Sequence, residues 1–349
     1  MATTFAVPDG RVAMAATLYT GTGTISQAVS NAVNTVSFQP DLVWVKARSA
    51  SASNSLYDSI RGTKKFLASN TSDAEIDFSP YGVTTFGSSG FTVGDISSGF
   101  YYCNGSGITY VGWQWKAGGT AVSNTAGTIT SSVSANTTAG FSVVTYTGTG
   151  VAATIGHGLG VAPSLVMCKT RSSAQGFIVY HSALGATQFL GLTNTSAAVT
   201  SSAAWNNTAP TNSVFSVGVN SGTGGLTDPY VAYCWAPVAG YSAFGSYTGN
   251  GSADGPFIYT GFRPRFILYK GYSAAGYDWV MYDTSRNPTN ASALQLYSNT
   301  SQADYTGGPI DILSNGFKIR SVLNADNASG TSYIYAAFAE NPLKYANAR

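Results

Sequence analysis

The sequence predicts an all-β protein made of three tandem homologous domains of the β-sandwich or jelly-roll type. Two observations support this prediction. The first is composition: the 349 residues include 40 glycines and 22 tyrosines, and only 9% are charged. Helix surfaces are rich in Glu, Lys, Leu and Gln, whereas strands favour Thr, Tyr, Val, Phe and Trp, and turns favour Gly, Asn and Ser. The second is a set of phrases that recurs three times in one order, as expected of an internally repeated fold.

Each repeat contains the same phrases. The opening phrase is YTGTG at 19–23 and 146–150, and YTGNG at 247–251. A proline phrase follows as FQPDLVWVKARS (38–49), VAPSLVMCKTRS (161–172) and FRPRFILYKGYS (262–273). Next come YDSIRG (57–62), YHSALG (180–185) and YDTSRN (282–287), which lead into SNTSDA (69–74), TNTSAA (193–198) and SNTSQA (298–303). The repeat ends with GFTVG (90–94), VFSVG (214–218) and GFKIR (316–320), then TYVGWQWKA (109–117), PYVAYCWAP (229–237) and SYIYAAFAE (332–340).

These phrases set the expected domain boundaries at 17–117, 142–238 and 244–349, with about 100 residues in each, the usual size of a domain. Residues 118–141 are rich in Gly, Ser, Thr and Ala and are interpreted as a linker or extended spacer. Residues 1–16 lie before the first repeat. Several short strands per unit, separated by Gly, Asn and Ser turns, favour a sandwich or jelly roll, with a flattened barrel as the alternative.

The proline phrase predicts a strand that is entered through a proline, which is tolerated at a strand's first residue. Alternation places Leu42 and Trp44 on one face and Val43 and Val45 on the other. Apolar residues on both faces indicate a central strand that is covered on both sides.

Basic residues bracket this phrase. Lys46 and Arg48 follow the apolar run, and Arg263 and Arg265 flank Pro264. We interpret them as solvated strand ends, because long basic side chains can lie along apolar surface while their charged groups stay in water.

The last phrase predicts an alternating strand with large residues on its inward face. These inward residues are Val111, Trp113 and Trp115, then Val231, Tyr233 and Trp235, and then Ile334, Ala336 and Phe338.

Charge and hydropathy argue against nucleic-acid binding, membrane insertion and a signal peptide. The 17 basic and 15 acidic residues give a formal charge of +2, without the long basic run that nucleic-acid binding favours. No stretch of about 18 apolar residues is present, so no membrane insertion is expected. The N-terminal residues lack a charged leader followed by an apolar core, so no signal peptide is predicted and synthesis in a cytoplasm is expected.

Few residues qualify for catalysis or metal binding. Cys103, Cys168 and Cys234 have neither disulfide nor zinc spacing, and the last two lie in apolar runs where cysteine acts as a small hydrophobe. Asp73, Glu75 and Asp77 form the only local acidic group, read as an exposed loop or strand edge, with a carboxylate or metal site as the alternative. Because glycan hydrolysis usually needs two carboxylates beside the bond, we predict no enzyme, no cofactor and no catalytic or metal-ligating residue.

Only two histidines occur, His157 and His181. His157 lies in a glycine-rich turn, and His181 stands where the other repeats have Asp58 and Asp283. A position that accepts both Asp and His is expected to be a polar turn or cap partner.

Aromatic residues are more abundant than core filling requires, and they could stack on sugars at the surface. The alternative is that they form cross-strand pairs within the sheets. The residues in question are Tyr101, Tyr102, Tyr272, Tyr277, Trp279, Tyr282, Tyr297 and Tyr305.

The phrases YTGNGSADGPFIYTGFRPRFILYK, SNTSQADYTGGPIDILSNGFKIR, SYIYAAFAENPLKYANAR and TYVGWQWKAGG resemble a repeated module of bacteriophage virion proteins, common in phages of marine and other aquatic bacteria. Proteins with this module are usually described as tail fibres or structural proteins of unknown role. The resemblance covers nearly the whole chain, including ATTFAVPDGRVAMAATLYTG at the start. It implies location and role and assigns no residues, because the module has no established catalytic motif.

This resemblance implies a virion structural protein, foremost a tail fibre or receptor-binding component that contacts the host surface. The alternatives are a head-decoration, head-fibre or tail-collar protein and, as a second alternative, a polysaccharide-degrading tail enzyme. Expected partners are other virion proteins, further copies of the chain in a homo-oligomer such as a trimer, and a glycan or protein of the host surface. Residues 1–16 would then attach the protein to the virion, and the distal units would carry the contact surface.

Overall fold

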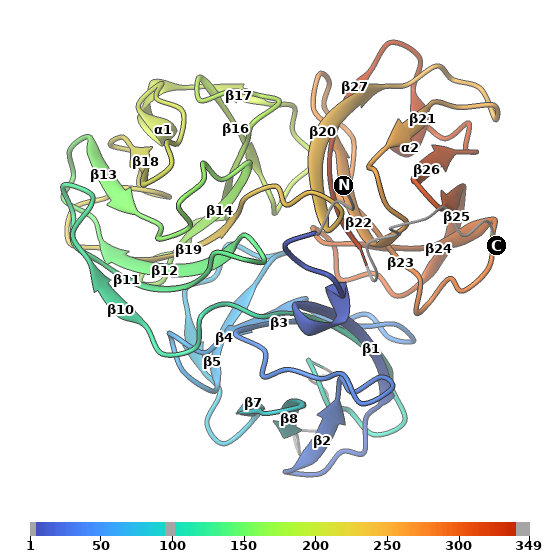
Figure 1. Cartoon of the computed structure of the whole chain (residues 1–349), viewed down its shortest axis with the longest axis horizontal. Helices are drawn as coiled ribbons and strands as arrows, with labels where there is room; N and C mark the ends of the chain where they lie inside the picture. Colours follow the sequence, from blue (N-terminus) through green and yellow to red (C-terminus); the bar gives the residue numbers. More distant parts are fainter. Residues whose placement is uncertain (1–4, 95–101, 340–349) are drawn as a thin grey trace.

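The computed structural model describes residues 5–94 and 102–339. This part of the chain is almost entirely β, arranged as three lobes around a common centre (Figure 1). The helical segments are the short turn η1 (Gly10–Val12) and two four-residue helices, α1 (Ser202–Trp205) and α2 (Asn324–Asn327). No helix in the described ranges has the length and apolar character needed to cross a membrane. The predicted all-β class is confirmed.

The first unit is a sandwich of two antiparallel sheets. The larger sheet has the order β1-β9-β3-β4-β5-β6, and the smaller has the order β2-β8-β7. The strands are β1 (Met14–Thr20), β2 (Gln27–Ser30), β3 (Leu42–Ala47), β4 (Ser55–Asp58), β5 (Lys65–Ala68), β6 (Ile76–Asp77), β7 (Gly82–Gly87), β8 (Gly90–Gly94) and β9 (Thr109–Trp115).

The second unit repeats this arrangement. Its larger sheet has the order β10-β11-β12-β19-β14-β15-β16-β17, and β13 pairs with β18 in the smaller one. The strands are β10 (Val122–Asn124), β11 (Ser131–Asn136), β12 (Phe141–Thr147), β13 (Ala153–Gly156), β14 (Leu165–Thr170), β15 (Ile178–His181), β16 (Gln188–Gly191), β17 (Val199–Thr200), β18 (Val214–Val217) and β19 (Pro229–Trp235).

In the third unit the two layers are continuous, in the order β20-β27-β22-β23-β24-β25-β26-β21. The long strand β25 pairs with β24 and also with β26, so it joins the layers. The strands are β20 (Ser242–Thr248), β21 (Phe257–Tyr259), β22 (Pro264–Gly271), β23 (Val280–Asp283), β24 (Ser292–Tyr297), β25 (Tyr305–Leu313), β26 (Gly316–Ile319) and β27 (Ser332–Ala339).

One strand order therefore occurs three times: β1-β9-β3-β4-β5-β6, β12-β19-β14-β15-β16-β17 and β20-β27-β22-β23-β24-β25. The three prolines occupy matching places, since Pro40 and Pro163 precede β3 and β14 by two residues and Pro264 opens β22. The repeated phrases thus correspond to repeated strands with the same neighbours.

The central strand β3 shows why its sequence is apolar on both faces. Leu42 and Trp44 face a core that the three units share, whereas Val43 and Val45 face the core inside the first sandwich. The alternation predicted from the sequence is confirmed, and the inward residues of β9, β19 and β27 all reach the shared core.

This shared core lies at the centre of the ring of lobes (Figure 1). Trp115 of the first unit packs edge-to-face on Trp235 of the second and on Phe338 of the third, with ring centroids 5.8 and 5.7 Å apart. Three further cores lie inside the individual sandwiches. In the first two lobes the smaller sheet lies on the outer side and the larger sheet faces the centre, and in the third lobe β21 and β26 lie on the outer side of the continuous sheet.

The segments outside the repeats differ from expectation. Residues 118–141, expected as a linker, contain β10 and β11, which extend the larger sheet of the second unit. β11 pairs with β12 over 132–136 and with β10 over 131–133, so it lies between two strands of this sheet. Residues 1–4 lie outside the described residues, but Val7 and Ala13 are buried in the shared core and Met14 begins β1. The described part of 1–16 is thus integrated into the fold.

Candidate functional site

The acidic group that the sequence singled out does not form one site. The three acidic residues were expected to form an exposed loop or strand edge, and this is wrong for Glu75. Its carboxylate is held between Arg61 of the first unit and Arg171 of the second unit, at 3.0 and 2.8 Å. Burial raises the pKa of Glu75, but the hydrogen bonds and charges of the two arginines outweigh this effect and hold it below its usual value. Asp77 instead pairs with Lys65 at the surface. In the described residues no three His, Cys, Asp or Glu side chains gather to hold a metal.

Glu75 belongs to an ionic network at the interface between units one and two. Arg61 is fully buried and pairs with Asp58 at 2.5 Å, and the hydroxyl of Tyr233 donates to the same Asp58 carboxylate at 2.8 Å. The backbone N–H of Glu75 also donates to the carbonyl of Arg171. These contacts make the network structural, because every charged group in it has a partner across or beside the interface.

The interface between units three and one repeats this network with equivalent residues. Arg286 pairs with Asp283 at 2.6 Å and with Asp304 at 3.0 Å. Asp304 in turn pairs with Arg48 at 2.8 Å, and the indole N–H of Trp113 donates to Asp283. The three lobes therefore close into a ring in which each unit contacts both others.

The interface between units two and three lacks these charges. The residues in the equivalent places are His181, Leu184, Ala198, Tyr272 and Ala336. The backbone bond from Ala198 to the carbonyl of Tyr272 matches the bond from Glu75 to Arg171. The two bonds make Ala198 the structural equivalent of Glu75, whereas the phrases SNTSDA and TNTSAA align Ala198 with Ala74.

His181 acts as the polar turn partner that was expected. Its Nδ1 accepts from the backbone N–H of Ala183, and its Nε2 lies 3.0 Å from the carbonyl of Tyr335. Asp58 and Asp283 likewise accept backbone N–H groups of the following turn. His157 is also buried, and its Nδ1 accepts from the N–H of Leu159. Burial lowers the pKa of His181 to about 4 and lowers that of His157 as well.

The interpretation of the basic residues as solvated strand ends is wrong for Lys46 and Arg265, which are buried, whereas Arg48 and Arg263 are partly exposed. Lys46, Lys169 and Lys270 are fully buried. Lys46 donates to the side-chain oxygen of Asn54 and to the carbonyl of Thr300 across the interface, at 2.5 and 2.9 Å. Burial lowers the pKa of Lys46 to about 7, aided by the charge of Arg286, and burial lowers the pKa values of Lys169 and Lys270 to about 8.

Arg265 and the three cysteines also have structural positions. Arg265 is buried and donates to the carbonyl of Ala16 across the interface between units three and one, so it too is no solvated strand end. The three cysteines are buried, and burial raises the pKa of Cys168 to about 12, which leaves its thiol protonated and unreactive.

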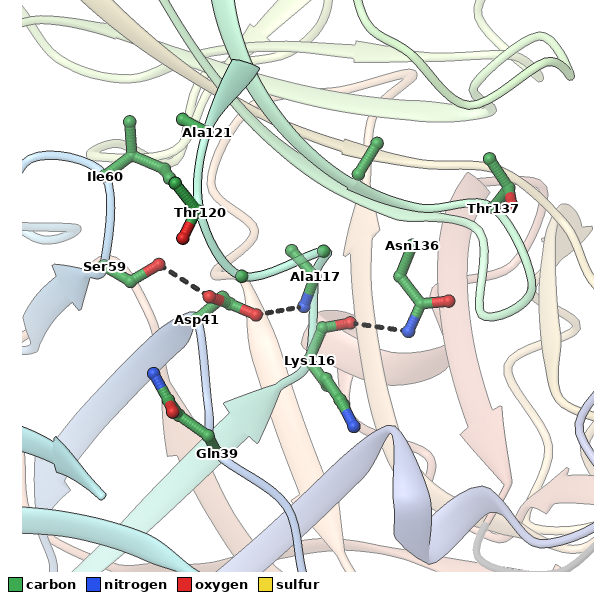
Figure 2. A pocket seen from close by; sticks show the side chains of 13 residues that line it. Gln39, Asp41, Ser59, Ile60, Lys116, Ala117, Thr120, Ala121, Asn136 and Thr137 are labelled. Carbon is green, nitrogen blue, oxygen red and sulfur yellow. Dashed lines mark hydrogen bonds between the residues drawn. The ribbon is translucent and has the colours of Figure 1, made fainter. Parts of the chain in front are cut away.

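A groove of about 940 Å³ lies between the first unit and the turn after β11 (Figure 2). Its buried carboxylate, Asp41, accepts from the hydroxyl of Ser59 at 2.6 Å and from the N–H of Ala117 at 2.7 Å. Burial raises the pKa of Asp41, and these hydrogen bonds offset part of that effect. Asn136 donates to the carbonyl of Lys116, which ties the two walls together. Asp41 therefore has a structural role, because each of its carboxylate oxygens accepts a hydrogen bond from a neighbouring segment.

Most of the aromatic residues that the sequence singled out are buried or partly buried. Trp279, Tyr282 and Tyr297 belong to the cores, and Tyr102, Tyr272 and Tyr277 are partly buried. Tyr101 lies outside the described residues. Tyr305 is exposed, with 43% of its surface accessible. Ring pairs such as Tyr269–Tyr282 agree with the alternative that aromatics hold the sheets together.

Two exposed aromatics were missed by the sequence reasoning. Phe257 and Tyr259 on β21 are 46% and 68% exposed, whereas Ile258 between them is buried in the third sandwich. Together with Tyr305 they are the exposed aromatics of the described residues, and all three belong to the third unit. The run Phe-Ile-Tyr is apolar at every position, so alternation could not indicate which side chains face outward.

Charged residues surround these two rings. Lys318 is the register partner of Phe257 on one side and of Asp311 on the other. Its Nζ lies 2.6 Å from a carboxylate oxygen of Asp254, and Arg320 lies 3.6 Å from that oxygen and 3.4 Å from Asp311. We call Phe257, Tyr259, Lys318, Arg320, Asp254 and Asp311 the aromatic face; it lies on the outer sheet of the third lobe (Figure 1).

The aromatic face has no counterpart on the other units. The strand pairs align Val29, Ile155 and Ile258 on the inward side, where all three are apolar. On the outward side the position of Phe257 is Ala28 or Thr154, and that of Tyr259 is Ser30 or Gly156. The inward positions have kept their character while the outward positions of the third unit have become aromatic, so the fold does not require these rings.

Comparison with known proteins gives a family. No curated protein matches this chain. The family model described as "Domain of unknown function (DUF7483)" matches residues 12–342. The match extends over all three units. The chain therefore belongs to the DUF7483 family.

Proposed function

We propose that this protein is a bacteriophage virion structural protein, and foremost a tail fibre or receptor-binding component that contacts the host surface without a catalytic role. The observation that carries the proposal is the aromatic face. Phe257 and Tyr259 are exposed although the fold does not require them there, and exposed aromatics beside charged groups are typical of binding surfaces. The resemblance of the repeated phrases to virion modules supports the location.

Adsorption measurements test the proposal. Purified protein is expected to bind susceptible bacteria, and antibodies against it are expected to block phage adsorption. Absence of binding together with unaffected adsorption would refute the receptor-binding role. Electron microscopy of particles labelled with the antibody would give the position of the protein on the tail or head.

The closed ring favours a second candidate. The shared core joins the three units into one body instead of a string of separate domains, and a body of this kind suits a knob on a capsid or collar. A head-decoration, head-fibre or tail-collar protein would be labelled at those positions, and antibodies would leave adsorption unchanged.

A polysaccharide-degrading enzyme is the third candidate and the least supported. Asp254 and Asp311 both lie near Arg320, but a general acid needs a raised pKa. The hydrogen bond from Lys318 instead lowers the pKa of Asp254. Release of reducing ends from host polysaccharide would revive this candidate.

A further inference from the structure

We propose that the aromatic face binds the pyranose rings of a neutral polysaccharide. This inference rests on the proposed contact with the host surface and names the class of ligand.

The two rings form a short row on one side of β21. Side chains two residues apart point the same way, at roughly 6–7 Å along a strand. A Cβ at Gly316 would come within 3.1 Å of a ring atom of Phe257, which shows that this ring lies across the neighbouring strand. The absence of a side chain at Gly316 therefore allows the ring to lie along the sheet, where an apolar sugar face can stack on it.

Hydrogen-bonding groups of both kinds border this row. Asp254 is 81% exposed in its side chain and Arg320 is 43% exposed, so both retain positions for further hydrogen bonds. A sugar hydroxyl donates and accepts, so it can bond to a carboxylate and to a guanidinium at once. This mixture suits neighbouring hydroxyl groups of one sugar ring.

The charges of the face cancel, which favours a neutral ligand. Lys318 and Arg320 are balanced by Asp254 and Asp311, and ion pairs join all four. An anionic membrane or an acidic polymer would be recognised by an excess of basic groups. A protein partner would need an extended apolar centre of several hundred Å², which two rings do not provide.

The test compares three proteins on an array of immobilised neutral glucans, galactans and mannans, with alginate as the acidic polymer. The proteins are the natural chain, the variant F257A/Y259S and the control Tyr305→Ser. F257A/Y259S introduces the residues that the first unit has at the same positions, Ala28 and Ser30, so the fold should tolerate it. Tyr305→Ser removes an exposed aromatic that starts β25, six residues before Asp311. Equal unfolding temperatures establish that all three proteins are folded.

The natural chain and Tyr305→Ser are expected to bind at least one neutral polymer with equal affinity, and F257A/Y259S at least tenfold more weakly. Binding is expected to change little between low and high salt, unlike binding to an acidic polymer. Binding to no neutral polymer, binding to alginate alone, or equal binding by F257A/Y259S would overturn the inference.

Adsorption to bacteria separates this inference from the proposed function. If F257A/Y259S binds cells as well as the natural chain does, the aromatic face is not the glycan site, although the receptor-binding role stands. If the natural chain binds no cells, the proposed function itself fails.

Discussion

His181 is neutral in the folded protein because both ring nitrogens are engaged. The carbonyl of Tyr335 can only accept, so Nε2 carries the proton, and Nδ1 accepts from the N–H of Ala183. Protonation of Nδ1 would break the second bond and place a charge in a buried interface. The position is occupied by Asp in the other two units, where an arginine partner is present. Histidine in place of aspartate at this one position therefore changes how the interface between units two and three responds to pH.

Acid should destabilise the protein through His181. Its folded pKa of about 4 lies below the ordinary value of 6.5, so its contribution is complete above pH 6.5 and is lost as the pH falls towards 4. Between pH 7 and 4.5 the natural chain should lose about 2–3 kcal/mol more than the variant His181→Asn, at 1.36 kcal/mol per pKa unit. Urea unfolding of both proteins at each pH measures the difference. Parallel curves would show that His181 does not titrate in this way.

The buried lysine Lys46 should also make the protein more stable as the pH rises, but in alkaline solution. Its folded pKa of about 7 lies below the ordinary 10.5, so the cost of burying its charge declines as the pH rises from 7 to 10.5. The natural chain should gain up to about 2 kcal/mol between pH 7.5 and 9.5 relative to Lys46→Met. The comparison uses the slope of unfolding free energy against pH, because the hydrogen bonds lost in the variant shift all values together. Equal slopes would contradict the prediction.

At the scale of elements, the repeated phrases predicted the strands well. The proline strand, its two apolar faces and the inward residues of β9 followed from alternation, because each larger sheet is covered on both sides. The burial of Lys46 did not follow, since a lysine at a strand end can face water or a neighbouring unit. The pairing of β10 and β11 with β12 was also hidden, because Ser and Thr suit both linkers and edge strands.

The ionic network between units one and two should be costly to break on one side only. Arg61→Leu leaves Asp58 buried without its cation and should lower the free energy of unfolding by about 3–5 kcal/mol. The double variant Asp58→Asn/Arg61→Leu removes both charges and should recover at least about 1 kcal/mol of this loss. Lys65→Leu breaks an exposed pair in the same unit and should cost less than about 1 kcal/mol. A double variant as unstable as Arg61→Leu would show that charge burial is not the cause.

At the scale of the whole molecule, the main surprise for sequence reasoning is the shared core. Repeats of about 100 residues are large enough to fold separately, and nothing in a phrase says whether its outer face meets water or another copy. Trp115, Trp235 and Phe338 meet at the centre, so each unit completes its core with side chains from the others. This arrangement agrees with a family match that spans all three units.

The ring should therefore unfold in one cooperative transition. A calorimetric scan is expected to show a single peak, and Trp115→Ala should lower the midpoint reported by probes in all three units. The reason is that a cavity at the centre removes contacts from every unit at once. Separate peaks, or an effect confined to the first unit, would show that the units are independent domains.

The lone aromatic face also sets how firmly one molecule can hold a surface. Among the described residues, the molecule offers such a face on one of its three lobes, so a single chain would be monovalent. Stacking on two rings would give weak attachment that reverses quickly. Durable adhesion would then depend on avidity, with many chains displayed on one particle and engaging a repeating polymer together.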